Sequence, residues 1–187
     1  MPRDYAAQPP NRVRRADRQI EDEGWIRDFL HRAPLAALAT ASSAGQPFIN
    51  SNLFVYDAAN YCIYMHTARV GRTKANILQN AQVCLSVSEM GRLLPAPEAL
   101  EFSVEYAGVA VFGRAEVVTE GREAARALQL LLDKYFAHLR PGDDYRPATA
   151  AELKRTAVYR IRIEAWSGKR KQVAADFPGA FNYGSRR

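Results

Sequence analysis

The sequence has few of the residues that build metal centres and disulfide frameworks. It contains two cysteines, Cys62 and Cys84, without CxxC spacing, and its three histidines are not clustered. We therefore expect no zinc site. Both thiols lie in apolar, strand-like segments, which fits buried free cysteines in a reducing cytoplasm. No apolar run is long enough to cross a membrane and no early run resembles a signal peptide, so we predict a cytoplasmic protein with no membrane partner.

The common catalytic and nucleotide-binding motifs are also missing. The patterns GxGxxG, GxxxxGK[ST], HExxH and GxSxG do not occur. Each of these motifs places a particular backbone or side-chain group against a ligand, so their absence argues against specific folds. A Rossmann dehydrogenase, a P-loop ATPase, a zincin and an α/β-hydrolase are therefore set aside.

The formal net charge of +6 fits nucleic acid, an anionic ligand or simple solubility. Much of the excess lies at the two ends: Arg3, Arg12, Arg14, Arg15, Arg18, Arg186 and Arg187. We interpret a basic, proline-containing end as a solvated tail rather than a nucleic-acid arm. This predicts a flexible basic arm at residues 1–17, one folded domain at 18–175 and a C-terminal tail at 176–187. No RNA-binding aromatic motif occurs, so no nucleic-acid partner is expected.

Hydrophobic periodicity predicts three main helices and about six strands. The helices are expected at residues 18–32 (capped by Asp17), 73–79 and 120–138 (capped by Thr119), with one or two further helical turns at 148–154. The strands are expected at 35–40, 47–56, 61–67, 82–89, 101–118 and 156–166, with bulges near Gly108 and Gly113 and a long loop at 90–100. The early strands are joined mainly by hairpins, which favours an antiparallel sheet over a doubly wound parallel one. The predicted fold class is α+β, a mostly antiparallel six-stranded split β-barrel flanked by helices.

The segment at residues 47–56 alternates in an informative way. One face carries Ile49, Ser51, Leu53 and Val55, and the other carries Phe48, Asn50, Asn52, Phe54 and Tyr56. Two amides within an aromatic face suit neither open solvent nor a dry core. The pattern predicts a half-buried surface that meets a ligand or a partner subunit.

Residues 66–80 combine a strand end, a glycine turn and a short helix. Thr67 ends the strand, and Arg69, Arg72 and Lys74 crowd the junction. A helix start offers free backbone N–H groups and the positive end of a dipole, so it suits an anion such as phosphate. Cations ordinarily favour the opposite end of a helix, and their presence here strengthens the prediction of a phosphate site.

An ordered set of motifs carries a family resemblance. It comprises residues 35–40, 47–54, 64–68, 71–74, 81–87, 108–118 and 166–169. Each motif is weak alone, but together they cover about residues 20–170. The chain resembles the pyridoxamine 5′-phosphate oxidase-like superfamily of FMN-binding split β-barrels. The branch that it resembles most contains nitroimidazole-resistance and related flavin-nucleotide-binding proteins.

The resemblance implies a homodimer with FMN at the subunit interface. It implies that Ile49, Asn50, Ser51 and Asn52 run along the flavin ring and that Thr67, Arg72 and Lys74 hold the phosphate, with Thr73 as a further cofactor-binding residue. It also implies that Trp166 and Lys169 approach from one subunit. His66 matches a position near the flavin and is the candidate catalytic residue. The vitamin-binding Arg–His pair of the B6 oxidase has no clear match in the tail, so that activity is not implied.

The function expected from these features is an FMN-binding oxidoreductase. It would pass a hydride between small-molecule donors and acceptors, with NAD(P)H as a candidate donor. An F420-dependent reductase on the same barrel and a non-catalytic flavin- or haem-binding protein stay open as alternatives. A basic nucleic-acid-binding barrel ranks lowest. Structural roles also stay open for these residues. His66 could be a structural histidine and Trp166 a core residue, and Asn50 and Asn52 could form hydrogen bonds across a dimer interface.

Overall fold

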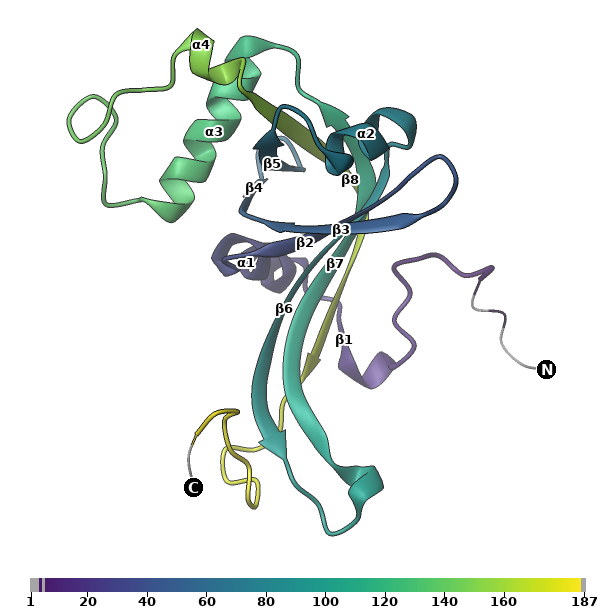
Figure 1. Cartoon of the computed structure of the whole chain (residues 1–187). Helices are drawn as coiled ribbons and strands as arrows, with labels where there is room; N and C mark the ends of the chain where they lie inside the picture. Colours follow the sequence, from purple (N-terminus) through teal and green to yellow (C-terminus); the bar gives the residue numbers. More distant parts are fainter. Residues whose placement is uncertain (1–3, 5, 186–187) are drawn as a thin grey trace.

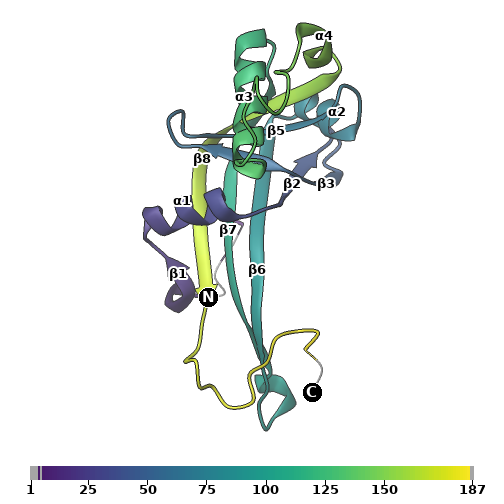
Figure 2. The same cartoon turned by 90° about the vertical axis from the view of Figure 1, so that its left-hand side faces the viewer.

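The computed structural model describes residue 4 and residues 6–185, which form an eight-stranded antiparallel sheet with helices against it (Figures 1 and 2). The strands are β1 (Gln19–Ile20), β2 (Ala36–Ala41), β3 (Pro47–Asn52), β4 (Phe54–Asp57), β5 (Cys62–Ala68), β6 (Gln82–Leu94), β7 (Ser103–Val117) and β8 (Thr156–Lys171). The helices are α1 (Glu23–Arg32), α2 (Arg72–Gln79), α3 (Gly121–Tyr135) and α4 (Ala150–Leu153), with short 3-10 turns at Ala16–Arg18 and Ala99–Glu101.

The strand order is β3-β2-β6-β7-β8-β5-β4, and β1 pairs with β8. Every pairing between strands is antiparallel. The α+β, antiparallel class is confirmed, but the predicted count of six strands is wrong. The predicted strand at residues 47–56 divides at Leu53, so that β3 pairs with β2 while β4 pairs with β5. Because β3 and β4 stand at opposite ends of the strand order but adjoin in sequence, the sheet must curl, as a split barrel does.

The main core lies inside this curl. Leu38, Leu85, Val111 and Ile161, from four different strands, are fully buried there, and α1 covers them with Phe29 and other apolar residues. A second cluster lies on the other side of β5 and β8, where α3 packs Ala127 and Leu131 against Tyr64 and Val158. Figure 2 shows the corresponding arrangement, with α1 across the long strands and α3 above them.

Two predicted helix starts are corrected. The first helix begins at Glu23, because the Asp22 carboxylate accepts a hydrogen bond from the backbone N–H of Gly24 at 2.8 Å and replaces Asp17 as the cap. The helix α3 is capped by Glu120 rather than Thr119, and it ends at Tyr135. In both cases a carboxylate that satisfies free N–H groups determines the first turn.

The strands β6 and β8 are longer than predicted. The loop expected at 90–100 is wrong in part, because β6 continues to Leu94 through an irregularity between Met90 and Leu93. Pairing with β7 supplies backbone hydrogen bonds along this stretch. A second irregularity, between Phe112 and Gly113, confirms one predicted bulge, whereas Gly108 lies in regular pairing. The result is a long β6–β7 hairpin that projects beyond α1 (Figure 1).

The chain after β8 folds back along this hairpin. Arg92 donates hydrogen bonds to the carbonyls of Ala174 and Ala175 at 3.0 and 2.8 Å, and it pairs with the Glu105 carboxylate at 2.9 Å. Leu93 and Phe181 exchange backbone hydrogen bonds. Arg3, Arg186 and Arg187, part of the predicted basic ends, lie outside the described residues, and the division at residues 17 and 175 stays a prediction.

Candidate functional site

The start of α2 has unsatisfied backbone donors. Gly71 caps the helix with φ of 154° and without a side-chain hydrogen bond, and the first helical bond runs from Ala75 N–H to the Gly71 carbonyl. This φ lies in the positive region that favours glycine. Within the described chain, no group accepts a hydrogen bond from the backbone N–H of Arg72, Thr73 or Lys74. Three donors at the positive end of the helix dipole therefore face outward.

Cations surround these donors and no acid offsets them. The first turn of α2 contains no acidic residue. Arg72 is exposed and Lys74 is half-buried, while Arg69 donates to the Lys154 carbonyl at 3.5 Å. None of the ion pairs in the described part of the chain involves Arg69, Arg72 or Lys74. The junction thus keeps its positive charge for an anion.

The Thr67 hydroxyl at the end of β5 is hydrogen-bonded to the hydroxyl of a buried tyrosine. Thr67 Oγ1 donates to the Ala68 carbonyl at 2.9 Å and lies 2.8 Å from Tyr159 Oη, so the tyrosine is the donor of the second bond. Tyr159 lies on β8 and is fully buried. Burial raises the pKa of its hydroxyl, which keeps it a neutral donor. The sequence predicted the strand at 156–166 but no role for Tyr159; a phenol among aliphatic neighbours was the available signal.

A short polar network fixes α2 against β2 and β3. Asn50 Nδ2 donates to Thr73 Oγ1 at 3.4 Å, and Thr73 is buried with 5% exposure. Asn76, also buried, donates from Nδ2 to Thr40 Oγ1 at 3.0 Å, and Thr40 donates to the Phe48 carbonyl at 3.4 Å. Sequence reasoning did not identify Thr40 or Asn76. The network holds the start of α2 at a fixed distance from β3.

The predicted ring platform divides between two faces of β3. Asn50 and Asn52 point toward α2 and β5, since Asn52 Nδ2 donates to the His66 carbonyl. Ile49 and Ser51 face the other side, because they stand opposite Ala39 and Ala37 of β2, and Ile49 is 64% exposed. A period of two cannot place four consecutive side chains on one surface. A flavin ring on one face of β3 would therefore contact the side chains of one alternating pair, Asn50 and Asn52 or Ile49 and Ser51, and only the backbone of the other pair.

His66 lies beside Thr67 in sequence but on the opposite face of β5. It stands directly opposite Val158, a residue of the cluster beneath α3. Burial lowers the pKa of the imidazole, so it is neutral at neutral pH. The proposed catalytic role of His66 stays a prediction.

Trp166 and Lys169 lie apart from the turn within one chain. Trp166 is 9% exposed, with its ring centroid 6.1 Å from that of Tyr56 and 5.0 Å from that of Tyr61. Lys169 is exposed, and its Nζ lies 5.7 Å from the centroid of the Tyr106 ring. The single chain thus gives Trp166 a core position.

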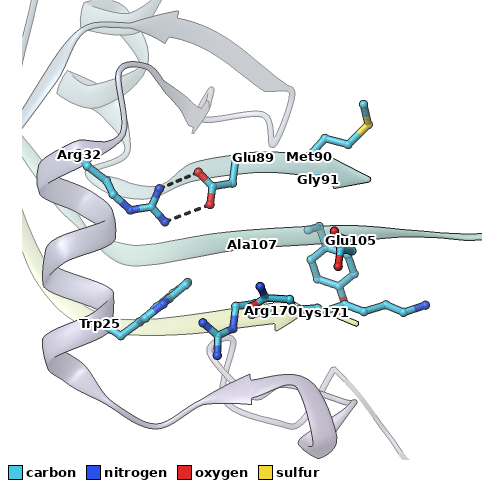
Figure 3. A pocket seen from close by; sticks show the side chains of 11 residues that line it. Trp25, Arg32, Glu89, Met90, Gly91, Glu105, Ala107, Arg170 and Lys171 are labelled. Carbon is cyan, nitrogen blue, oxygen red and sulfur yellow. Dashed lines mark hydrogen bonds and ion pairs between the residues drawn. The ribbon is translucent and has the colours of Figure 1, made fainter. Parts of the chain in front are cut away.

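Two of the hollows beside the long strands lie near α1 and on the outer face of the sheet. One, of about 410 Å³, lies on the outer face, where small residues such as Ser86, Gly108 and Ala110 line it together with the larger Met90, Tyr106 and Lys169. The other, of about 240 Å³, lies beside α1 (Figure 3). There Arg32 from α1 makes a bidentate ion pair with Glu89 of β6, with N–O distances of 2.8 and 3.0 Å. Trp25 lies across from Arg170 in the same hollow. Neither hollow includes the turn at residues 67–74.

The residues that the structure describes contain no group of three or more His, Cys, Asp or Glu side chains able to hold a metal ion. Across the same residues, no helix is both long enough and apolar enough to span a membrane.

A family model described as pyridoxamine 5′-phosphate oxidase matches residues 22–170. No curated protein matches the chain.

Solved structures share its fold at low sequence identity. The flavocytochrome Anf3 from Azotobacter vinelandii is 24% identical, with a TM-score of 0.76 over 95% of this chain and 86% of that one. The FAD and heme binding protein from Mycobacterium smegmatis is 22% identical, with a TM-score of 0.72 over 83% and 74%. A candidate 5-nitroimidazole antibiotic resistance protein from Bacteroides thetaiotaomicron is 18% identical, with a TM-score of 0.67 over 81% and 85%.

Proposed function

The chain belongs to the pyridoxamine 5′-phosphate oxidase family, and from this premise we propose that it is an FMN-dependent oxidoreductase whose cofactor is held at the β5–α2 turn. The start of α2 is the observation that carries the proposal. Three free backbone N–H groups, two basic side chains and no acid converge there. That donor set fits a phosphomonoester, which needs several hydrogen-bond donors and compensating positive charge.

Each residue of the turn has a distinct part in binding. The N–H groups of Arg72, Thr73 and Lys74 would donate to phosphate oxygens, and the side chains of Arg72 and Lys74 would offset the charge. The Thr67 hydroxyl, held by Tyr159, would supply one more contact on the β5 side. The Asn50–Thr73 bond keeps β3 beside the phosphate, so the ring would extend along β3.

A second subunit is part of the proposal. Part of the outer face of β6, β7 and β8 carries small side chains, such as Ser86, Gly108 and Ala110, which would allow close approach of another sheet. The projecting hairpin exposes Met90, Leu100 and Phe102, with Leu100 91% exposed. Apolar groups displayed on a projecting arm are typical of an association surface. We therefore include a homodimer, in which the exposed Lys169 of one subunit approaches the flavin of the other, while Trp166 keeps its core position.

Bound FMN would supply the redox chemistry by accepting and passing on a hydride. The protein's part is to anchor the phosphate, orient the ring and exclude water. His66 is neutral at neutral pH, so it is able to accept a proton if its ring reaches the substrate. The substrate pair proposed is a small-molecule acceptor with a reduced donor such as NAD(P)H.

The descriptions of the structural neighbours support a flavin without selecting one. One of them is described as a flavocytochrome, and another as an FAD and heme binding protein. FMN carries a phosphomonoester, whereas haem carries no phosphate. A turn built from phosphate donors therefore favours FMN over haem.

The test is the visible spectrum of the purified protein followed by FMN titration. Flavin bands and fluorescence quenching on FMN addition would support the proposal. A Soret band, or a colourless protein that binds F420 but not FMN, would contradict it. The double variant Arg72→Ala/Lys74→Ala is expected to lose FMN retention, whereas Arg14→Ala, an exposed arginine of the N-terminal arm, should retain it. Unchanged flavin content in the double variant would refute the phosphate site.

A further inference from the structure

Two arginines stand directly opposite each other on the outer face of the sheet. Arg114 of β7 and Arg162 of β8 are register partners, and both side chains are exposed. Like charges in directly opposed positions destabilise an antiparallel pair. No ion pair or side-chain hydrogen bond joins either guanidinium to another of the described residues. The repulsion between them is therefore uncompensated within the chain.

The neighbouring row of the same face shows the ordinary arrangement. Glu116 of β7 stands opposite Arg160 of β8. Arg160 Nε donates to Glu116 at 2.8 Å, and its Nη1 donates to Glu123 of α3 at 2.8 Å. Two adjacent rows on one surface thus differ in a single respect, since one pairs opposite charges and the other pairs like charges.

The like-charge row borders a hollow of about 520 Å³ between the start of α3 and strands β5 and β8. Its lining includes four arginines and three glutamates, together with Cys62 and Tyr64: Arg122, Arg126, Arg160, Arg162, Glu116, Glu120 and Glu123. Arg114 lies outside this lining, on the far side of Arg162. Cys62 continues the row, because it is the register partner of Arg162 on β5. The volume falls within the range that small-molecule sites occupy.

The acids around this hollow are already engaged. Asp57 pairs with Arg126 at 2.7 Å. Glu120 accepts hydrogen bonds from the backbone N–H of Arg122 and Glu123 at 2.8 and 2.6 Å. Arg122 has no carboxylate partner among the ion pairs of the described chain. Arg122 and Arg162 therefore both line the hollow without a carboxylate partner among the ion pairs of the described chain.

We propose that Arg162, with Arg114 opposite it on β7 and Arg122 lining the same hollow, forms a second anion site, which binds an oxyanion with two negative charges such as the phosphate group of a small molecule. A guanidinium offers two parallel donors that match phosphate oxygens, and a dianion would neutralise the opposed pair. The site is separate from the cofactor turn. Cys62 and Thr67 lie five residues apart on opposite faces of β5, which corresponds to roughly 17 Å along the strand.

The experiment uses inorganic phosphate as the probe and the full chain in the Arg72→Ala/Lys74→Ala background, so that the cofactor turn does not contribute. Phosphate binding is measured by calorimetry and by thermal unfolding, with sodium chloride added to hold ionic strength constant. Phosphate is expected to bind and to raise the Tm. Adding Arg162→Met should weaken phosphate binding at least tenfold, whereas adding Arg14→Met should not change it.

A second readout separates a binding role from a merely structural one. Without phosphate, the Arg162→Met variant is expected to unfold at a higher temperature than its parent, because one like charge is gone. Added phosphate should then raise the Tm of the parent and leave that of the variant unchanged. Equal responses in both proteins, or a phosphate effect no larger than that of chloride, would overturn the site.

Another outcome would also overturn it. If Arg162→Met changes the monomer–dimer equilibrium but not phosphate binding, carboxylates of a second copy neutralise the row. None of these measurements uses flavin, so they test the second anion site independently of whether the proposed FMN function is correct.

Discussion

The hydroxyl of Tyr159 lies 2.8 Å from the hydroxyl of Thr67. This contact joins the buried side of β8 to the exposed end of β5, across 92 positions of sequence. Because Tyr159 is fully buried, its position is determined by the core. The orientation of Thr67 at the phosphate turn is therefore determined by the core as well.

The substitution Tyr159→Phe should weaken FMN binding while leaving the basic side chains in place. It removes the donor that fixes Thr67, and one such hydrogen bond is worth about 1 kcal/mol, or roughly fivefold in Kd. Quenching of flavin fluorescence measures the change. Tyr64→Phe is the matched control, since it removes a hydroxyl that donates to Glu123 at 2.8 Å, away from the turn. Equal weakening by both variants would contradict a specific role for Tyr159.

Gly113→Ala should destabilise the fold strongly. A Cβ at Gly113 would lie 2.1 Å from the Arg162 carbonyl oxygen, so β8 would have to move at the bulge. Overpacking against backbone predicts a loss of about 3 kcal/mol in the free energy of unfolding. Gly121→Ala is the control, because nothing lies within 4 Å of its Cβ and alanine at the start of α3 should stabilise by about 0.5 kcal/mol. Denaturant unfolding measures both, and a harmless Gly113→Ala would disprove the close approach.

Glu105 should give the protein an acid-sensitive component of stability. Hydrogen bonds from the Arg92 side chain and from the backbone N–H of Val173 lower the pKa of its carboxyl from 4.5 to about 2. The folded state thus holds fewer protons than the unfolded state between these values. Its contribution is complete above about pH 4.5 and is lost as the pH falls toward 2.

Thermal unfolding of Glu105→Gln across this range should show a flatter acid limb and a lower Tm at pH 7. Glu89→Gln, which breaks an exposed pair with Arg32, should change the Tm little. An acid limb as steep in Glu105→Gln as in the parent would rule out the assignment.

Lys134 should make the stability of the fold depend on pH in the alkaline range. Burial lowers the pKa of its ammonium group from 10.5 to about 8, where Nζ lies 3.2 Å from the Leu30 carbonyl oxygen and 3.7 Å from the centroid of the Phe54 ring. Between about pH 8 and 10.5 the unfolded chain keeps a proton that the folded chain has released, so stability should rise with pH. Lys134→Met should remove that rise in denaturant unfolding, and Lys154→Met, at an exposed position, should preserve it. A rise that survives in Lys134→Met would have to come from another group.

Local signals located the turn closely. The glycine, the cations and the amphipathic spacing of residues 71–79 lie within one stretch, and the observed α2 begins one residue before the predicted start. The alternation at residues 47–56 identified the two faces but not the break at Leu53. That break follows from which partner strands are near, and strand pairing depends on the whole sheet.

Contacts between segments distant in the chain could not be predicted from the sequence. The Thr67–Tyr159 bond and the opposition of Arg114 to Arg162 depend on the register of β8 with two neighbouring strands. A shift of one residue would place either pair on opposite faces. The extensions of β6 and β8 likewise depend on pairing with β7, which local propensity does not report.

The Arg92–Glu105 pair has a consequence for how the molecule opens. Arg92 donates to three successive carbonyls, those of Val173, Ala174 and Ala175, while the Glu105 carboxylate accepts the Val173 N–H. The segment after β8 and the end of the β6–β7 hairpin therefore cannot separate without breaking the same cluster of bonds. In hydrogen exchange, their amides should gain and lose protection together, as one cooperative unit whose opening does not require the barrel to unfold.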